Sequence, residues 1–272
     1  MTDPSFGCTT RRLAAACLAL LACLCPAAGA GAASPEEAGL KIARDAYDRD
    51  KGFGNFTARQ TMVLRNKRGQ ESRRQLRIKV LEVEDSGNRT LFVFDRPRNV
   101  KGTAFLIHSH RTKADDQWLY LPALKRVKRI SSSNRSGSFM GSEFSYEDLG
   151  SQEIEKYTYK FLREEACGKR RCTVVEQVPT AKRSGYRRQL VWRDKEDLRL
   201  WKIAYYDRKN AHLKTLTLSK YKRHLDRFWR AGEMKMVNHL TGKSTDMLWS
   251  DYKFGGKVSE SDFSRTGLKR AR

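Results

Sequence analysis

The sequence has little that would mark an enzyme or an integral membrane protein. None of the patterns H-E-x-x-H, G-x-S-x-G, P-loop or G-x-G-x-x-G occurs in it, which argues against zinc or serine hydrolysis and against nucleotide binding. Beyond the N-terminal region no apolar run reaches the roughly 18 residues that span a bilayer. An isolated pair such as His108 and His110 at a strand end is more typical of solvated side chains than of a metal site. We therefore expect no enzymatic activity, no metal and no cofactor.

Cysteine is scarce in the body of the chain. Of the six cysteines, only Cys167 and Cys172 lie beyond the N-terminal region. Their spacing, C-G-K-R-R-C, is wrong for a C-x-x-C redox motif, and no His/Cys cluster for zinc lies nearby. In an oxidising compartment the pair is most simply a disulfide that closes a hairpin.

The N-terminal region has the three parts of a secretory signal peptide. Arg11 and Arg12 precede an apolar run over residues 13–25, and small residues then match the A-x-A cleavage pattern. We predict a signal peptide over residues 1–32, cleaved near Ala32, and one domain over residues 33–272 in the periplasm.

One alternative for the N-terminus remains open. Leu20-Leu21-Ala22-Cys23 resembles the lipobox of bacterial lipoproteins. Acylation of Cys23 would anchor the protein to a membrane, although the A-x-A matches downstream favour simple cleavage.

Acidic residues are few relative to basic ones. The 55 Lys and Arg residues outnumber the 31 Asp and Glu residues, and the formal net charge is +24. In a cytosolic protein this excess would suggest nucleic acid as a partner, but export argues against it. An anionic membrane surface is the preferred partner class, and the alternative is that the charge only maintains solubility.

Periodicity predicts one helix followed by many strands. Ser34, Pro35 and Glu37 form a capping box with proline at the first helical position, and the helix should end near Gly52. Apolar and polar residues then alternate, as over residues 75–80. The predicted strands cover residues 75–80, 91–94, 117–121, 157–163, 173–178, 186–193, 200–206, 213–221, 233–237 and 245–252.

Strands at this spacing, joined by short polar turns, indicate a large antiparallel sheet, sandwich or barrel. Only the N-terminal helix and residues 141–149 are available to cover its apolar face. The shortage of covering elements suggests that an apolar ligand lies on that face, although two sheets could also cover each other.

The segment over residues 115–149 is the most informative. Aromatic side chains on a strand precede a basic strand, and a Gly/Ser loop then leads to an apolar tip. The aromatic rings could contact the tails of a lipid while the neighbouring cations bind its headgroup phosphate. The alternative is an ordinary hairpin with a polar outer face. The apolar tip suits a mobile lid, but it could also pack down. The candidate lipid-binding residues are Trp118, Tyr120, Phe139, Met140 and Phe144, and the candidate headgroup- or membrane-facing residues are Lys125, Arg126, Lys128 and Arg129.

This segment resembles the exported LolA-like proteins that are described as outer-membrane lipoprotein-sorting proteins. The resemblance extends over most of residues 33–272. Further matching stretches are residues 35–40, 51–54, 62–65, 101–106, 205–209, 213–216, 236–239 and 241–245.

The resemblance implies a mainly antiparallel β fold, a half-open β-barrel with a helical lid. It implies a periplasmic carrier that holds lipid or lipoprotein acyl chains in an apolar cleft and shuttles them between membranes. An RND-type membrane transporter is then an expected partner. The other hypothesis is a non-catalytic accessory module that docks on such a transporter or on an anionic membrane through its basic face.

Overall fold

A computed structural model describes residues 33–84 and 86–271. The predicted signal peptide, its cleavage near Ala32 and the alternative at Cys23 lie outside the described residues. The first element of the described residues is helix α1, Pro35–Asp50, whose N-terminus is capped as predicted. The Ser34 hydroxyl accepts a hydrogen bond from the Glu37 amide at 3.2 Å, and the Glu37 carboxylate accepts one from the Ser34 amide at 2.9 Å.

Strands make up most of the described chain. Each predicted strand is present to within a few residues, and the structure adds several that the periodicity did not resolve. The strands are β1 Asn55–Arg65, β2 Glu71–Leu81, β3 Arg89–Arg96, β4 Ala104–His108, β5 Asp116–Leu121, β6 Arg126–Arg129, β7 Tyr157–Cys167, β8 Arg170–Pro179, β9 Tyr186–Asp194, β10 Leu200–Asp207, β11 His212–Ser219, β12 Lys222–His224, β13 Phe228–Arg230, β14 Glu233–Asn238 and β15 Ser244–Phe254.

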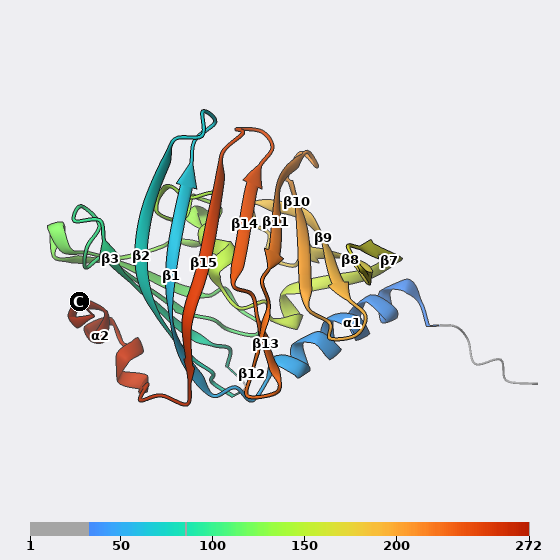
Figure 1. The fold of residues 1–272 in the computed structure, drawn as a ribbon, viewed down its shortest axis with the longest axis horizontal. Coiled ribbons are helices and arrows are strands. Elements are labelled where there is room, and N and C mark those ends of the chain that lie inside the picture. The colour runs from blue at the N-terminus through green and yellow to red at the C-terminus, as the bar shows by residue number, and fades with distance from the viewer. Residues whose placement is uncertain (1–32, 85, 272) are drawn as a thin grey trace, which may run out of the picture. The chain divides into compact units, whose positions relative to one another are not determined.

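Thirteen of these strands form one antiparallel sheet. Their order is β6-β5-β4-β3-β2-β1-β15-β14-β11-β10-β9-β8-β7, so β6 and β7 are free edges and the sheet does not close into a barrel. Strands β12 and β13 pair separately as a hairpin. The sheet is strongly curved, and the segment between β6 and β7 lies inside the curve (Figure 1). The predicted half-open antiparallel barrel is therefore confirmed.

The two faces of the sheet have separate cores. The inner face carries the larger one, which includes Phe92, Phe105, Ile203 and Met236. On the outer face, the side chains of β3 to β5 pack against Phe263 of the short helix η6, Glu260–Phe263, and against Leu268 of helix α2, Arg265–Arg270. Helices α1 and α2 thus lie at different ends of the sheet (Figure 1).

The predicted disulfide is confirmed. Cys167 is the last residue of β7. Cys172 is in β8, where it lies opposite Glu165 of β7, so the disulfide joins the two strands of a hairpin. Its Cα atoms are 5.8 Å apart.

No helix among the described residues is both long enough and apolar enough to cross a bilayer.

Candidate functional site

One half of the inner face is filled by the chain itself. Phe139, in the short helix η3 Phe139–Gly141, is completely buried. Its ring centroid lies 6.0, 5.9 and 5.1 Å from those of Phe92, Phe94 and Phe105. Of the two alternatives for the apolar tip, the structure therefore shows the packed one.

Buried ion pairs hold this segment in place. The Lys214 ammonium group donates to the Asp148 carboxylate at 2.7 Å, and their side chains are 5% and 2% exposed. Asp148 also accepts a hydrogen bond from the Tyr186 hydroxyl at 2.7 Å. The segment between β6 and β7 is thus fastened to strands β9 and β11 at its centre.

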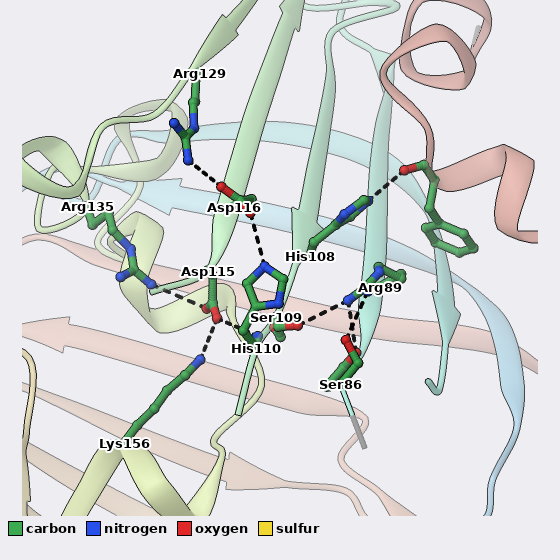
Figure 2. A network of polar contacts seen from close by, with 12 residues as sticks. Ser86, Arg89, His108, Ser109, His110, Asp115, Asp116, Arg129, Arg135 and Lys156 are labelled. Atoms are coloured by element: carbon green, nitrogen blue, oxygen red, sulfur yellow. Dashed lines mark hydrogen bonds and ion pairs between the residues drawn. The ribbon is translucent and has the colours of Figure 1, made fainter. Parts of the chain in front are cut away.

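A second polar cluster fastens the ends of the segment to the loop between β4 and β5 (Figure 2). The Asp115 carboxylate, 3% exposed, binds Lys156 and lies 3.3 Å from the Arg135 guanidinium group. It also accepts a hydrogen bond from the His110 amide at 3.1 Å. Gly150 lies so close that a Cβ atom there would overlap Oδ2 of Asp115. These contacts hold the segment between β6 and β7 against the loop between β4 and β5.

The two histidines of the H-x-H pair belong to the same region but have different partners. The His110 ring lies 3.0 Å from Asp116, which also binds Arg129 (Figure 2). His108 Nε2 lies 2.7 Å from the Phe263 carbonyl oxygen, and this contact holds η6 on the outer face. Within residues 33–84 and 86–271, no three His, Cys, Asp or Glu side chains gather as metal ligands would.

The other half of the inner face remains open beneath α1. A cleft of about 950 Å³ lies between this helix, strands β7 to β10 and the β12–β13 hairpin. Its apolar lining comes from both sides, from Ala43 and Ala46 on the helix and from side chains that include Phe53, Ile154 and Phe228. A cleft of this size suits an organic ligand.

Helix α1 is a lightly attached cover of this cleft. It approaches β7 most closely at Gly39, where a Cβ atom would lie only 2.6 Å from the Phe161 amide nitrogen. Gly39 is also the only buried residue of the helix, and Leu40 is 37% exposed. The attachment therefore depends on backbone contact and polar bonds more than on an apolar face.

Polar bonds secure the C-terminal half of the helix. The Tyr47 hydroxyl donates to Glu153 at 2.7 Å, and Asp50 binds Arg230. The Arg49 guanidinium group donates to the Glu196 carbonyl oxygen at 2.8 Å. Burial, followed by the hydrogen bond to Glu153, raises the pKa of Tyr47.

The open half of the sheet carries polar residues within the cleft. Gln177 of β8 is 4% exposed, and its amide donates to Gln189 of β9 at 2.8 Å. Tyr159 of β7 is 8% exposed, and burial raises the pKa of its hydroxyl. Arg193 of β9 also lines the cleft. The arrangement suits an amphiphile, which has apolar and polar parts, better than a purely hydrocarbon ligand.

The residues expected to bind lipid do not share one surface. Phe139 and Phe144 are buried in the inner core, with Met140 partly buried against it. Tyr120 and Trp118 pack in the outer core beneath η6 and α2. Trp118 also lines a smaller cavity of about 380 Å³ with Val127, Arg129 and residues of α2.

The predicted basic residues lie at a free edge of the sheet. Lys125 precedes β6, and Arg126, Lys128 and Arg129 lie within it, with all four side chains exposed. They are remote in sequence and strand order from the cleft beneath α1. Sequence reasoning missed the cleft residues Tyr47, Arg193 and Phe228, because no local pattern distinguishes them.

Comparison with known proteins identifies the family. An outer membrane lipoprotein-sorting protein domain from Vibrio parahaemolyticus is 54% identical, with 86% of this chain and 100% of that chain covered and a TM-score of 0.85. A DUF1329 family protein from Desulfovibrio piger is 30% identical over 87% and 100% of the two chains, with a TM-score of 0.82. The chain belongs to the family of these lipoprotein-sorting and DUF1329 proteins.

Two further comparisons concern the fold and a family model. A LolA superfamily protein from Nitrosomonas europaea, 18% identical, shares the LolA-like fold with a TM-score of 0.68 over 87% of this chain and 100% of that one. A family model described as "-like: Uncharacterized protein" matches residues 86–270. No curated protein sequence matches the chain.

Proposed function

We propose that this LolA-like protein is a periplasmic carrier of lipid or lipoprotein acyl chains, which it binds in the cleft beneath α1 and shuttles between membranes. The observation that supports this most is the cleft of about 950 Å³ between one lightly attached helix and the open half of the sheet. The name of the Vibrio parahaemolyticus relative, which concerns outer membrane lipoprotein sorting, favours the same class of cargo.

The energetics suit a carrier. Transfer of acyl chains from water is worth about 0.8 kcal/mol per CH₂ group, so binding needs no catalytic residue. A carrier must also release its cargo. A cover that buries only Gly39 and is otherwise held by polar bonds can open at a moderate cost in free energy.

The proposal places the cargo at a different site from the one expected of Phe139 and Phe144. These side chains fill the apolar half of the inner face, and they support the cleft from the side without lining it. The fixed segment between β6 and β7 would limit the cargo to the half beneath α1.

Blocking the cleft tests this proposal. Ala46 lies on the face of α1 that lines the cleft, so Ala46→Trp should fill it and abolish uptake of a fluorescent fatty acid. Ala181→Trp, in an exposed turn after β8, is the matched control and should bind as the unmodified protein does. Equal uptake by both variants, or no uptake by any form, would contradict the proposal.

The exposed cations of β6 support a second candidate function, docking on an anionic membrane or on an RND-type transporter. Lys125, Arg126 and Lys128 form no ion pair with another described residue. Vesicle flotation at rising salt distinguishes the two functions, because electrostatic docking is screened by salt whereas buried acyl chains are not. Flotation that is insensitive to Arg126→Gln with Lys128→Gln would exclude this surface.

A further inference from the structure

The charges that line the cleft beneath α1 do not balance locally. Each carboxylate there already has a donor. Four of them form ion pairs: Asp45 with Lys41 at 2.7 Å, Asp48 with Lys51 at 3.0 Å, Asp50 with Arg230, and Asp197 with Arg199 at 3.4 Å. The other two accept hydrogen bonds: Glu82 from the amides of Gly52 and Gly54 at 2.8 Å, and Glu153 from the Tyr47 hydroxyl at 2.7 Å.

Arg193 differs from the other cations in the cleft. Its side chain is on the inner face of β9, yet it forms no ion pair with any residue that the structure describes. The hydrogen bond that its side chain forms with the described residues is from Nη1 to the Leu198 carbonyl oxygen, at 3.3 Å. Arg193 is partly buried. Burial lowers the pKa of its guanidinium group, and the charge of Asp50, which is paired with Arg230, is among the effects that oppose this lowering.

Arg199, on the same wall of the cleft, is a buried arginine that has carboxylate partners, Asp194 and Asp197. Its side chain is 6% exposed, its Nε donates to Asp194 at 2.7 Å, and its guanidinium group lies 4.5 Å from the ring centroid of Trp229. Arg193 is partly buried and has no such ion pair, so an anionic ligand in the cleft could supply a direct counter-charge.

Two more cations stand at the exposed side of the cleft. Arg223 and Arg227 belong to the β12–β13 hairpin, line the cleft and form no ion pair among the described residues. They would attract an anion toward Arg193, while Phe53, Ile154 and Phe228 offer apolar contact beside it.

Given the proposed carrier function, on which this inference rests, we propose that Arg193 binds the anionic head of the cargo. The cargo is then an amphiphile that ends in a carboxylate or a phosphate, such as a fatty acid or a phospholipid. A lipid-modified cysteine offers esters and amides at that position, and no anion. The cleft therefore selects free anionic lipids over lipoproteins.

Three ligands with the same tail separate the parts of this inference. Decanoate and decyl phosphate carry an anion, and decan-1-ol does not. By isothermal titration calorimetry, the unmodified protein should bind one or both anions about tenfold or more tightly than the alcohol, since hydrogen bonds to a charged group are strong. Comparing the two anions shows whether the site prefers carboxylate or phosphate.

Variants then assign the preference to one side chain. Arg193→Gln should weaken only the anions, so that all three ligands bind alike, and Arg193→Lys should keep part of the preference. Arg126→Gln, which removes an exposed cation at the far edge of the sheet, is the matched control and should change nothing. Far-UV circular dichroism verifies that each variant is folded.

The possible failures are distinct. Equal binding of the three ligands by the unmodified protein would overturn the anion preference while leaving the carrier function intact. A preference that persists in Arg193→Gln, or that is lost equally in Arg126→Gln, would overturn the role of Arg193. If none of the three ligands binds, the carrier function itself fails, and this inference fails with it.

Discussion

The Lys214 ammonium group donates to the Asp148 carboxylate at 2.7 Å, and both side chains are almost fully buried. The pair joins β11 to the segment that fills the inner face. Lys214 also donates to the Glu143 carbonyl oxygen at 2.9 Å, so it contacts that segment at two places. In this protein the half-open barrel is therefore partly filled by the segment between β6 and β7, which Lys214 binds at two places.

Removing the lysine should be costly. Lys214→Met leaves Asp148 buried without its cation, and we expect the free energy of unfolding to fall by roughly 3–5 kcal/mol. Urea unfolding monitored by tryptophan fluorescence measures it. Lys220→Met, which breaks an exposed pair with Glu233, is the control and should have little effect. Equal stability of the two variants would show that the Lys214–Asp148 pair does not hold the segment.

Close contact at Gly39 should control the attachment of α1. In Gly39→Ala the new Cβ atom would meet the backbone of Lys160 and Phe161 at less than 3 Å, so the helix must move away from β7. We expect the amides of residues 36–50 to exchange hydrogen about tenfold faster, since such overpacking costs about 1–3 kcal/mol.

Gly256→Ala is the control for this change, because a Cβ atom at Gly256 meets nothing within 4 Å. Hydrogen exchange followed by mass spectrometry reports both variants. Unchanged exchange of α1 in Gly39→Ala would mean that the helix is held by its polar bonds alone.

Burial of His108 predicts a pH dependence of stability. Burial lowers the pKa of the imidazole below its ordinary value of 6.5, although the hydrogen bond with the Phe263 carbonyl opposes this. Between the lowered pKa and 6.5 the unfolded chain binds more protons than the folded one. Folding stability should therefore decrease as the pH falls through this range.

His108→Gln isolates this contribution, because the amide can still donate to Phe263 but does not titrate. The free energy of unfolding should fall more between pH 7.5 and pH 5 in the unmodified protein than in the variant. Parallel pH profiles for the two proteins would contradict the lowered pKa.

Much of the fold follows from local sequence patterns. The alternation in residues 75–80 marks β2 because one face of that strand is buried and the other is wet. Strand β4 lacks this signal, since four of its five residues, Ala104 to Ile107, are buried. The capping box at Ser34 and Glu37 and the hairpin disulfide were also predictable, because each depends on residues close together in the chain.

The cleft could not be predicted in the same way. Its lining combines α1, β7 to β10 and the β12–β13 hairpin, which only the strand order brings together. The position of Phe139, in the apolar tip, could not be predicted from the sequence either. An apolar side chain that faces a ligand and one that faces a core have the same sequence pattern, so local sequence could not distinguish them.

The most direct test of the account is to map where an acyl chain binds. The protein would be labelled with a fatty acid that carries a photoreactive diazirine in its tail, and the modified peptides would be identified by mass spectrometry. We predict saturable labelling within residues 43–53, 152–159, 193–200 or 221–230, which line the cleft beneath α1. Labelling confined to residues 118–129 and 265–269 around the smaller cavity, or no saturable labelling at all, would contradict it.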